Sequence, residues 1–223
     1  MPVVCIEGNI GVGKTTLCTH LAHAGLTVYY EHVHPQLLEL FYTEPAKYSF
    51  VLQLVNHADR QRLVHSVPGT TTILDRSVLG DYVFAAVNAT LGYITPREWA
   101  IYQSRAGRSV VAAVRQHLPR DATIICLVDE PVHCLRRAQA RNLSDAHHVE
   151  LAYLELLDTG HRMAMQLVAR DGHCQTGSLQ ASEYMAGALS AQDVLRVACQ
   201  HTLPAEIAAC TPLQEQLYHY LRG

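Results

Sequence analysis

Short apolar runs alternate with longer amphipathic segments along most of this chain. Four of the runs are rich in β-branched residues and apolar on both faces, which is typical of strands buried inside a parallel sheet. Because helical segments separate them, the pattern predicts a three-layer α/β/α fold with helices on both faces of a central parallel sheet. The predicted strands are Val3–Glu7, Thr27–Tyr30, Thr71–Leu74 and Thr123–Val128.

The segments between these runs carry apolar residues at helical spacing. One helix start is well marked, because Thr95 precedes Pro96 and Glu98 occupies the third helical position, which predicts a capped first turn. The predicted helices are Lys14–His23, Gln36–Tyr42, Ala46–His65, Asp81–Asn88, Pro96–Gln116, Pro131–Arg141 and Val149–Val168.

The pattern weakens after residue 170. From Asp171 to Gln192 the residues are mostly Gly, Ser, Gln and Ala, which indicates a long surface excursion. Val194–Ala198 is the best remaining strand candidate and brings the predicted sheet to about five strands, and Pro212–Leu221 predicts a closing helix. No internal repeat, linker or charge block divides the sequence, so we expect one domain over residues 1–223, with a tail from 170 to 223.

The composition is that of a globular protein without a polyanionic partner. Apolar residues make up 49% of the 223 positions and charged residues 17%, which excludes a wholly disordered chain or a collagen. A chain of this length buries about 70% of its extended surface, so its core needs neither metal nor disulfide. The net charge of −3 leaves no basic footprint, and we therefore expect no nucleic-acid partner.

Cysteine usage and the start of the chain point to a reducing compartment. The seven cysteines are scattered and form no C-x-x-C pair, and pairs such as His32/His34 lack partner cysteines at zinc spacing. No apolar run approaches the roughly 18 residues of a membrane span. The first apolar run leads directly into a glycine loop, which leaves no room for a signal peptide. We expect a cytoplasmic protein with no structural metal and no membrane partner.

A glycine loop follows the first predicted strand and matches the pattern G-x-x-x-x-G-K-[ST]. In such a loop the glycines turn backbone N–H groups toward phosphate oxygens, and the following helix adds its positive end. Lys14 is expected to reach the β- and γ-phosphates, and Thr15 to present its hydroxyl to Mg²⁺. The predicted nucleotide-binding residues are Gly8, Asn9, Ile10, Gly11, Val12, Gly13, Lys14, Thr15 and Thr16.

Three classes of phosphate-loop protein compete at this point. A GTPase needs Asn-Lys-x-Asp for its base, and neither Lys14 nor Lys47 stands in that motif. A motor-type ATPase would use Asp129, which ends an apolar strand, but Pro131 follows and the segment also fits a capped helix start. Asp75 ends the preceding strand and is the favoured Mg²⁺ carboxylate.

A small-molecule kinase needs a base for the acceptor hydroxyl and cations for the transferred group. Glu31 ends the second strand, at the same edge of the sheet as the phosphate loop, and is the candidate base. Arg137 and Arg141 share one face of a helix that runs into the polar segment 142–148. We expect them to neutralise phosphoryl charge, from a short lid at about residues 141–149.

These residues together resemble the deoxynucleoside kinase family, in the family's order and at nearly its spacing from about residue 3 to 165. The resemblance implies an α/β phosphate-loop fold and transfer of the γ-phosphoryl group of ATP, with Mg²⁺, to the 5′-hydroxyl of a deoxynucleoside. The matching motifs are Ile6–Thr16, Glu31, Gln53 within Tyr48–Gln53, Asp75-Arg76-Ser77, Glu98–Gln103, Arg137 with Arg141, and Tyr153–Leu157.

The resemblance also assigns roles by position. Glu31 would be the base, with Arg76 beside it, and Asp75, which stands where the family usually has Glu, would reach Mg²⁺. The remaining assignments are Tyr42 for the sugar 3′-hydroxyl, Gln53 for the edge of the base, the pair Arg60/Asp81 for base selection, Phe84 for stacking, and Asp145 as the lid acid. A long Arg60 held by Asp81 would crowd the methyl of thymine, so a deoxycytidine or purine substrate is favoured over thymidine.

Family members are mostly dimers, which implies a homodimer through Asp81–Asn88 and Pro96–Gln116. Two alternatives stay open from the residues alone. A nucleoside-monophosphate kinase would carry a second phosphate-binding cluster for its acceptor. A nucleotide sensor without enzymatic activity would bind ATP on the same loop.

Overall fold

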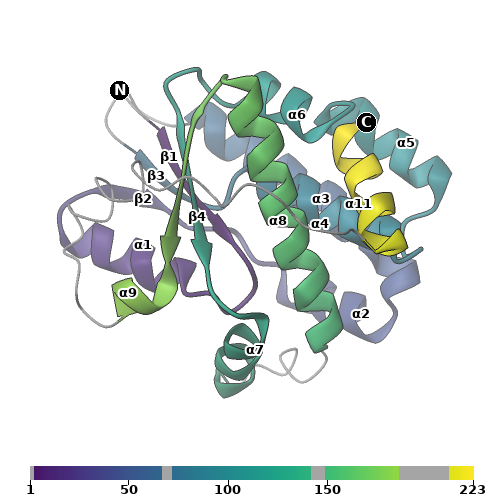
Figure 1. Ribbon diagram of the computed structural model, residues 1–223, viewed down its shortest axis with the longest axis horizontal. Coiled ribbons are helices and arrows are strands. Elements are labelled where there is room, and N and C mark those ends of the chain that lie inside the picture. Colours follow the sequence, from purple (N-terminus) through teal and green to yellow (C-terminus); the bar gives the residue numbers. More distant parts are fainter. Residues whose placement is uncertain (1–2, 67–71, 142–148, 186–210) are drawn as a thin grey trace.

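The computed structural model describes residues 3–66, 72–141, 149–185 and 211–223. At its centre lies a parallel sheet of five strands in the order β2-β3-β1-β4-β5 (Figure 1). The strands are β1 (Val3–Gly8), β2 (Thr27–Tyr29), β3 (Thr72–Asp75), β4 (Thr123–Val128) and β5 (Gln175–Gln180). In the register, Ile6 pairs with Asp75 and Gly8 with Leu127, so β1, β3 and β4 end close together.

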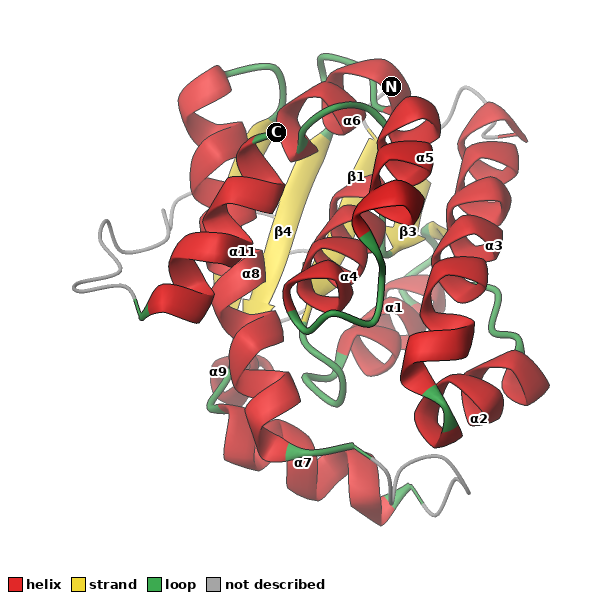
Figure 2. Cartoon of the chain, turned by 90° about the vertical axis from the view of Figure 1, so that its right-hand side faces the viewer, coloured by secondary structure: helices red, strands yellow, loops and turns green. Residues whose placement is uncertain are grey.

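Helices cover both faces of this sheet, so the three-layer α/β/α prediction is confirmed. Helix α1 packs against β1, β2 and β3 on one face, where α9 also lies, and Figure 2 looks onto the other face, which α4 and α8 cover. The helices are α1 (Lys14–His23), α2 (Pro35–Thr43), α3 (Pro45–Ser66), α4 (Val78–Thr90), α5 (Pro96–Ala106), α6 (Val110–His117), α7 (Pro131–Ala140), α8 (Leu151–Asp171), α9 (Ala181–Met185) and α11 (Pro212–Arg222).

The predicted capped start at Thr95 is confirmed, but the helix after it is shorter than predicted. The Thr95 hydroxyl accepts from the Glu98 N–H at 3.3 Å, and the Glu98 carboxylate accepts from the Thr95 N–H at 2.9 Å. The single helix predicted over Pro96–Gln116 is wrong, because Gly107 has φ 115° and separates α5 from α6. A residue with that φ cannot continue a right-handed helix.

The long surface excursion predicted for Asp171–Gln192 is also wrong over its described part, residues 171–185. Its first part forms β5, which pairs in parallel with β4 from Gln175 to Gln180, and α9 follows directly. The predicted strand Val194–Ala198 lies outside the described residues, as do residues 142–148 of the predicted lid. The predicted closing helix is confirmed as α11.

Helix α11 packs over α4 and α8, far along the chain from either (Figure 1). Leu217 is fully buried and lies over Gly160 of α8, where a side chain would collide with Val83 of α4. Every residue of α4 except Phe84 is buried. The dimer surface expected on Asp81–Asn88 is therefore wrong, because the chain's own helices cover it.

Among the described residues, no helix has the length and apolar character that a membrane span requires. The described cysteines are buried free thiols, as their apolar surroundings in the sequence predict. They are Cys5, Cys18, Cys126, Cys134 and Cys174.

Candidate active site

The glycine loop between β1 and α1 lies at the point where the strand order reverses around β1. Ligands of open α/β sheets bind beyond the carboxyl ends of the strands at such a point. Gly8, Gly11 and Gly13 have φ values of 133°, 74° and 107°, a region that other residues rarely adopt. A Cβ on Gly11 would lie 2.2 Å from the carbonyl oxygen of Cys134, so only glycine lets α7 approach the loop.

Lys14 lies inside this loop and is buried. Its ammonium donates to the carbonyl oxygens of Gly8 at 3.1 Å and Asn9 at 2.7 Å. Burial, reinforced by the positive charge of Arg76, lowers the pKa of Lys14 to about 8. A desolvated cation held among phosphate-loop groups binds anionic oxygens more strongly than one in bulk water.

Thr15 and Asp75 meet at the mouth of the loop. The Thr15 hydroxyl donates to Oδ2 of Asp75 at 2.9 Å, and Oδ1 of Asp75 is buried without a hydrogen-bond partner among the described residues. An all-oxygen pair with an unsatisfied carboxylate oxygen fits Mg²⁺, which prefers hard oxygen ligands.

Asp129, the alternative candidate for the Mg²⁺ carboxylate, binds Arg137 instead. Its Oδ2 accepts from Nη2 of Arg137 at 2.5 Å, and its Oδ1 accepts from the N–H of Glu130 at 2.8 Å. Nε of Arg137 then donates to the carbonyl oxygen of Gly11 at 2.7 Å. Asp129 therefore orients Arg137 against the phosphate loop, and this geometry favours Asp75 as the metal carboxylate.

Glu31 follows β2 and lies between two guanidinium groups. Its Oε1 accepts from Nη2 of Arg60 at 3.1 Å and its Oε2 from Nε of Arg76 at 3.0 Å. Burial acts to raise the pKa of Glu31, but the charges of Arg76, Arg60 and Lys14 outweigh it, and the pKa is lowered overall. Glu31 is therefore a carboxylate at neutral pH, able to accept a proton.

Arg60 connects this carboxylate to α4. Its guanidinium lies 3.3 Å from Oδ1 of Asp81, and Nη1 donates to the carbonyl oxygen of Asp75 at 3.0 Å. The side chains of Arg60 and Asp81 are only 4% and 3% exposed. The pair expected from the resemblance is thus brought together, and each partner satisfies the other's buried charge.

A cavity of about 260 Å³ joins the loop to these acidic and basic groups. Oε1 of Gln53 is buried in its wall without a hydrogen-bond partner among the described residues. The Phe84 ring lies under the Arg76 guanidinium, 4.7 Å from its central carbon. The predicted site residues in its lining are Ile10, Gly11, Lys14, Thr15, Glu31, Tyr42, Gln53, Arg76, Asp81, Phe84 and Arg141.

Other predicted residues lie around this cavity without lining it. Arg60 and Asp75 are buried behind its wall, and Arg137 donates to the Gly11 carbonyl oxygen of the loop. The exposed Thr16 belongs to the first turn of α1. Gly8, Asn9, Val12 and Gly13 shape the loop, and Asp145 lies outside the described residues.

Glu7 has a role that the sequence analysis did not assign. Its Oε1 accepts from the N–H and the hydroxyl of Ser77, both at 2.6 Å, and from the N–H of Gly80 at 3.1 Å. These bonds hold the turn in which Arg76 adopts a φ of 74°, unusual for a residue with a side chain. The available signal was a carboxylate ending an otherwise apolar strand.

His161 was also missed. It is buried, its ring packs edge-on against Phe84 at 6.1 Å between centroids, and Nδ1 lies 2.8 Å from the carbonyl oxygen of Leu157. Burial lowers the pKa of His161 to about 3, so the ring is neutral. An uncharged ring behind Phe84 keeps that wall of the cavity apolar.

The sequence model of the deoxynucleoside kinase family matches residues 4–182 of this chain. With the fold and the cavity described above, the chain belongs to the deoxynucleoside kinase family. It is similar in fold to the deoxyadenosine kinase of M. mycoides solved with bound dATP, with a TM-score of 0.70, 20% identity, and coverage of 87% of this chain and 96% of that one.

Curated relatives show the same likeness. The chain is 32% identical over 72% of its length to a deoxyguanosine kinase of Dictyostelium discoideum, and it spans a little more than half, 57%, of that relative's length. It is 31% identical to a probable deoxycytidine kinase of Fowlpox virus, over 71% of this chain and 69% of that one. Other matching relatives are named for deoxyadenosine and for thymidine.

Proposed function

We propose that this chain transfers the γ-phosphoryl group of ATP to the 5′-hydroxyl of a deoxynucleoside. The observation that carries the proposal is one cavity lined by Lys14 and Thr15 at its phosphate end and by Glu31 and Gln53 at its other end. Phosphoryl transfer requires donor and acceptor to be held together in one space that positions them in line. Family membership and the names of the relatives support the same reaction.

In this proposal Glu31 accepts the proton of the 5′-hydroxyl as that oxygen bonds to the γ-phosphorus, while the bond from the γ-phosphorus to the β,γ-bridging oxygen breaks and ADP leaves. Arg76 holds the carboxylate in place and also donates to the carbonyl oxygen of Gly8 at 3.0 Å, so base and phosphate loop share one anchor. Lys14, Arg137 and Arg141 neutralise charge on the transferring group, as preorganised cations do.

Mg²⁺ would be held by Thr15 and Asp75, and when bound it neutralises phosphate charge and orients the oxygens. The unpartnered Oδ1 of Asp75 supports this assignment. We expect Asp75→Asn to raise the Mg²⁺ concentration needed for half-maximal rate while the KM for the nucleoside changes little. An unchanged Mg²⁺ requirement would refute the assignment.

For the base, we propose a preference for deoxycytidine or a purine deoxynucleoside over thymidine. Gln53 offers an unpartnered amide oxygen, Phe84 offers a ring for stacking, and Arg60 with Asp81 lies behind them. The guanidinium of Arg60 behind this wall limits the space for the thymine methyl, and Asp81, which lines the cavity, accepts from an exocyclic amino group. Competition kinetics with all four deoxynucleosides test this preference, and a largest kcat/KM for thymidine would refute it.

The decisive experiment is ATP-dependent phosphorylation of the four deoxynucleosides by wild type, Glu31→Gln and Glu39→Gln. Loss of a general base should lower kcat by at least ~10²-fold. Glu39 is an exposed glutamate of α2 and serves as the matched control, with activity close to that of wild type. Turnover of dCMP or dTMP but not of nucleosides would favour a monophosphate kinase, and ATP binding without turnover would favour a sensor.

The oligomeric state stays a prediction. With α4 covered by α11, a homodimer would have to use other surfaces, and α5 presents Ile101 with 40% of its side chain exposed. Light scattering of the purified chain, with Ile101→Glu beside wild type, tests whether this face joins two copies. A dimer that survives the substitution would place the interface elsewhere.

A further inference from the structure

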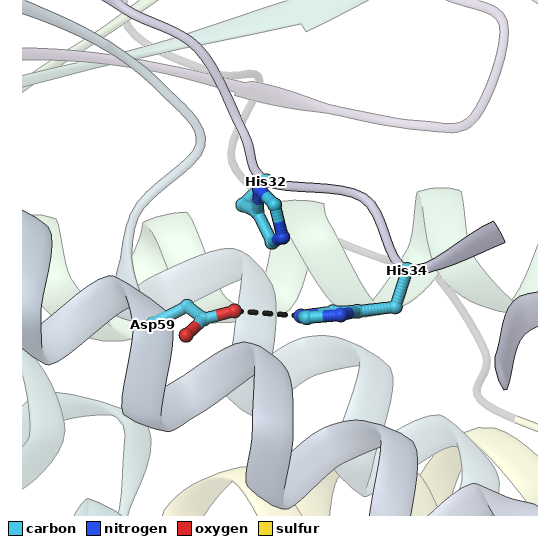
Figure 3. A group of neighbouring side chains, drawn as sticks. All are labelled: His32, His34 and Asp59. Carbon is cyan, nitrogen blue, oxygen red and sulfur yellow. Dashed lines mark hydrogen bonds and ion pairs between the residues drawn. The ribbon is translucent and has the colours of Figure 1, made fainter.

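Two histidines that line the acceptor end of the cavity, His32 and His34, meet an aspartate, Asp59. His32 and His34 belong to the segment between β2 and α2, and Asp59 comes from α3, 25 residues further along the chain (Figure 3). In Figure 3 the ring of His32 points toward the space between the other two side chains. None of the three has a role in the proposed phosphoryl transfer.

The spacing of these groups suits one metal ion. One ligand atom from each residue lies within 4.8 Å of the others, and Nε2 of His34 is 2.6 Å from Oδ2 of Asp59. Zinc binds nitrogen and oxygen at about 2.0–2.2 Å, so two of its tetrahedral ligands lie about 3.4 Å apart. Bringing all three atoms to that separation takes a rotation of His32, whose side chain is exposed, and a widening of the His34–Asp59 contact from 2.6 Å by about 0.8 Å.

Two of the three ligands are already oriented. His34 is the N-cap of α2, fixed by Pro35 after it and by its carbonyl oxygen, which accepts from the N–H of Leu38 at 2.9 Å. Oδ1 of Asp59 accepts from Nη1 of Arg62 at 3.1 Å, which leaves Oδ2 facing His34. The Arg62 contact is an outer partner of the Asp59 carboxylate, and such partners orient metal ligands and are worth 10–100-fold in affinity.

An ion can also reach the cluster. His32 and Asp59 line an open pocket of about 470 Å³ on the outside of α3. Arg60 lines the same pocket, but its charge is engaged by Glu31 and Asp81 on the inner side.

We propose that His32, His34 and Asp59 bind a divalent transition-metal ion of the Zn²⁺ class, with the fourth position open to water. Imidazole nitrogen suits Zn²⁺, Co²⁺ or Ni²⁺, whereas Mg²⁺ prefers oxygen ligands such as those of Thr15 and Asp75. The chain thus carries two metal sites of different chemistry. The ion ties the segment that carries Glu31 to α3.

The test is calorimetric titration of the full chain with Zn²⁺ alone, in buffer that contains excess Mg²⁺. Wild type, His32→Gln and His23→Gln are compared, because His23 is an exposed histidine at the end of α1 and controls for surface imidazole. We expect one tight site in wild type and His23→Gln. Affinity should fall at least ~10-fold in His32→Gln, since even an outer partner is worth that much.

Two further readouts guard against misfolding and adventitious binding. Without metal, His32→Gln should melt as wild type does, because the side chain is exposed. Saturating Zn²⁺ should raise the Tm of wild type by roughly 5 °C or more, but not that of His32→Gln. Co²⁺ should give a tetrahedral absorption spectrum that Asp59→Asn weakens. Equal Zn²⁺ affinity in wild type and His32→Gln would overturn the proposal and leave His34 and Asp59 as a hydrogen-bonded pair.

Discussion

The phosphate loop and the acceptor side of the cavity line the same cavity but depend on different parts of the chain, the first on the main chain and the second on side chains. The loop is made of main chain, since Gly8, Gly11 and Gly13 adopt left-handed conformations and α7 packs directly on Gly11. The acceptor side is made of charged side chains, with Glu31 and Asp81 sharing the guanidinium of Arg60.

This difference predicts how each side fails. A main-chain site is damaged by any added atom, whatever its charge, because its shape is the conformation itself. A site made of ion pairs is damaged by removing one partner, which leaves the other charge buried and unpaired. The two sides should therefore respond to different kinds of substitution.

The largest effect is expected on the acceptor side, from Asp81→Ala. Arg60 would keep a buried charge with one partner fewer, and breaking a buried pair costs about 3–5 kcal/mol in free energy of unfolding. Urea denaturation measures it. Asp171→Ala is the matched control, because its partner Arg115 is exposed, and it should cost far less. Equal losses would show that burial of the Arg60 pair is irrelevant to stability.

The next largest effect is expected on the loop, from Gly11→Ala compared with Gly25→Ala. Both glycines have positive φ values, 74° and 89°, but only Gly11 faces the backbone of α7, whereas no atom lies within 4 Å of a Cβ on Gly25. We expect about 1 kcal/mol for Gly25→Ala, from strain alone. Gly11→Ala should cost at least about 2 kcal/mol, since overpacking adds to the strain.

Chemical denaturation with and without ATP measures both glycine variants. The stabilisation by ATP should be lost in Gly11→Ala and kept in Gly25→Ala, because only the first displaces the phosphate loop. If both variants lose the same stability, close packing of α7 on the loop contributes nothing.

A smaller change in the free energy of unfolding, this time an increase, is expected from Lys14→Met. The folded pKa of about 8 lies below the ordinary value of 10.5, so at pH 7 the folded chain holds an unfavourably buried cation. The variant should be more stable than wild type by about 1 kcal/mol at pH 7, since one pKa unit corresponds to about 1.4 kcal/mol and two hydrogen bonds are lost. It should no longer be stabilised by ATP.

The difference in stability between Lys14→Met and wild type should depend on pH. As the pH rises through 8 the folded wild type releases the proton of Lys14, while the unfolded chain keeps it up to about 10.5, so wild-type stability rises and the advantage of the variant shrinks. Lys47→Met, which removes the chain's other lysine from an exposed site, should show no such trend. A constant advantage of Lys14→Met from pH 7 to 9.5 would contradict the lowered pKa.

The smallest effect is expected in the pH dependence of kcat/KM, from Arg60→Gln. Arg60 is one of the cations that lower the pKa of Glu31, so Arg60→Gln raises that pKa and protonates the base at a higher pH. Between pH 5 and 8 we expect kcat/KM of wild type to be flat on the acid side and that of Arg60→Gln to fall as the pH falls. Arg97→Gln, on the exposed start of α5, should keep the wild-type profile.

Local features of the chain were predictable from sequence, and features that depend on distant partners were not. The strand β1, the glycine loop and α1 follow one another without interruption, and the predicted helix Lys14–His23 has the bounds of α1. The strand β5 was missed because it lies at the sheet edge and buries only Gly177 and Leu179 among polar residues. Its pairing with β4, not its own pattern, makes it a strand.

The same distinction applies within the site. Glu31 is predictable as the carboxylate that ends the second strand, and Arg60 and Asp81 follow from resemblance to a family, but their ion pairs join three separate segments and need the fold to bring them together. His34 and Asp59 meet for the same reason, and a search for closely spaced ligands overlooks them. Gly107 interrupts a helical pattern that continues on both sides of it, and the break combines its φ of 115° with a new helix start at Ser109, whose hydroxyl accepts from the N–H of Ala112 at 3.1 Å.

The position of α11 has a consequence for biosynthesis. Helices α3, α5 and α6 also pack on α4, but the part of α4 and α8 around Gly160 contacts Leu217 of α11. Trp99 of α5 packs against Tyr220 at 5.0 Å between centroids, so residues of α11 complete the cover of this apolar surface. A ribosome must therefore make residues 212–222 before this apolar surface is covered. Until then the nascent chain exposes it to chaperones, and contacts between residues so far apart in sequence form slowly.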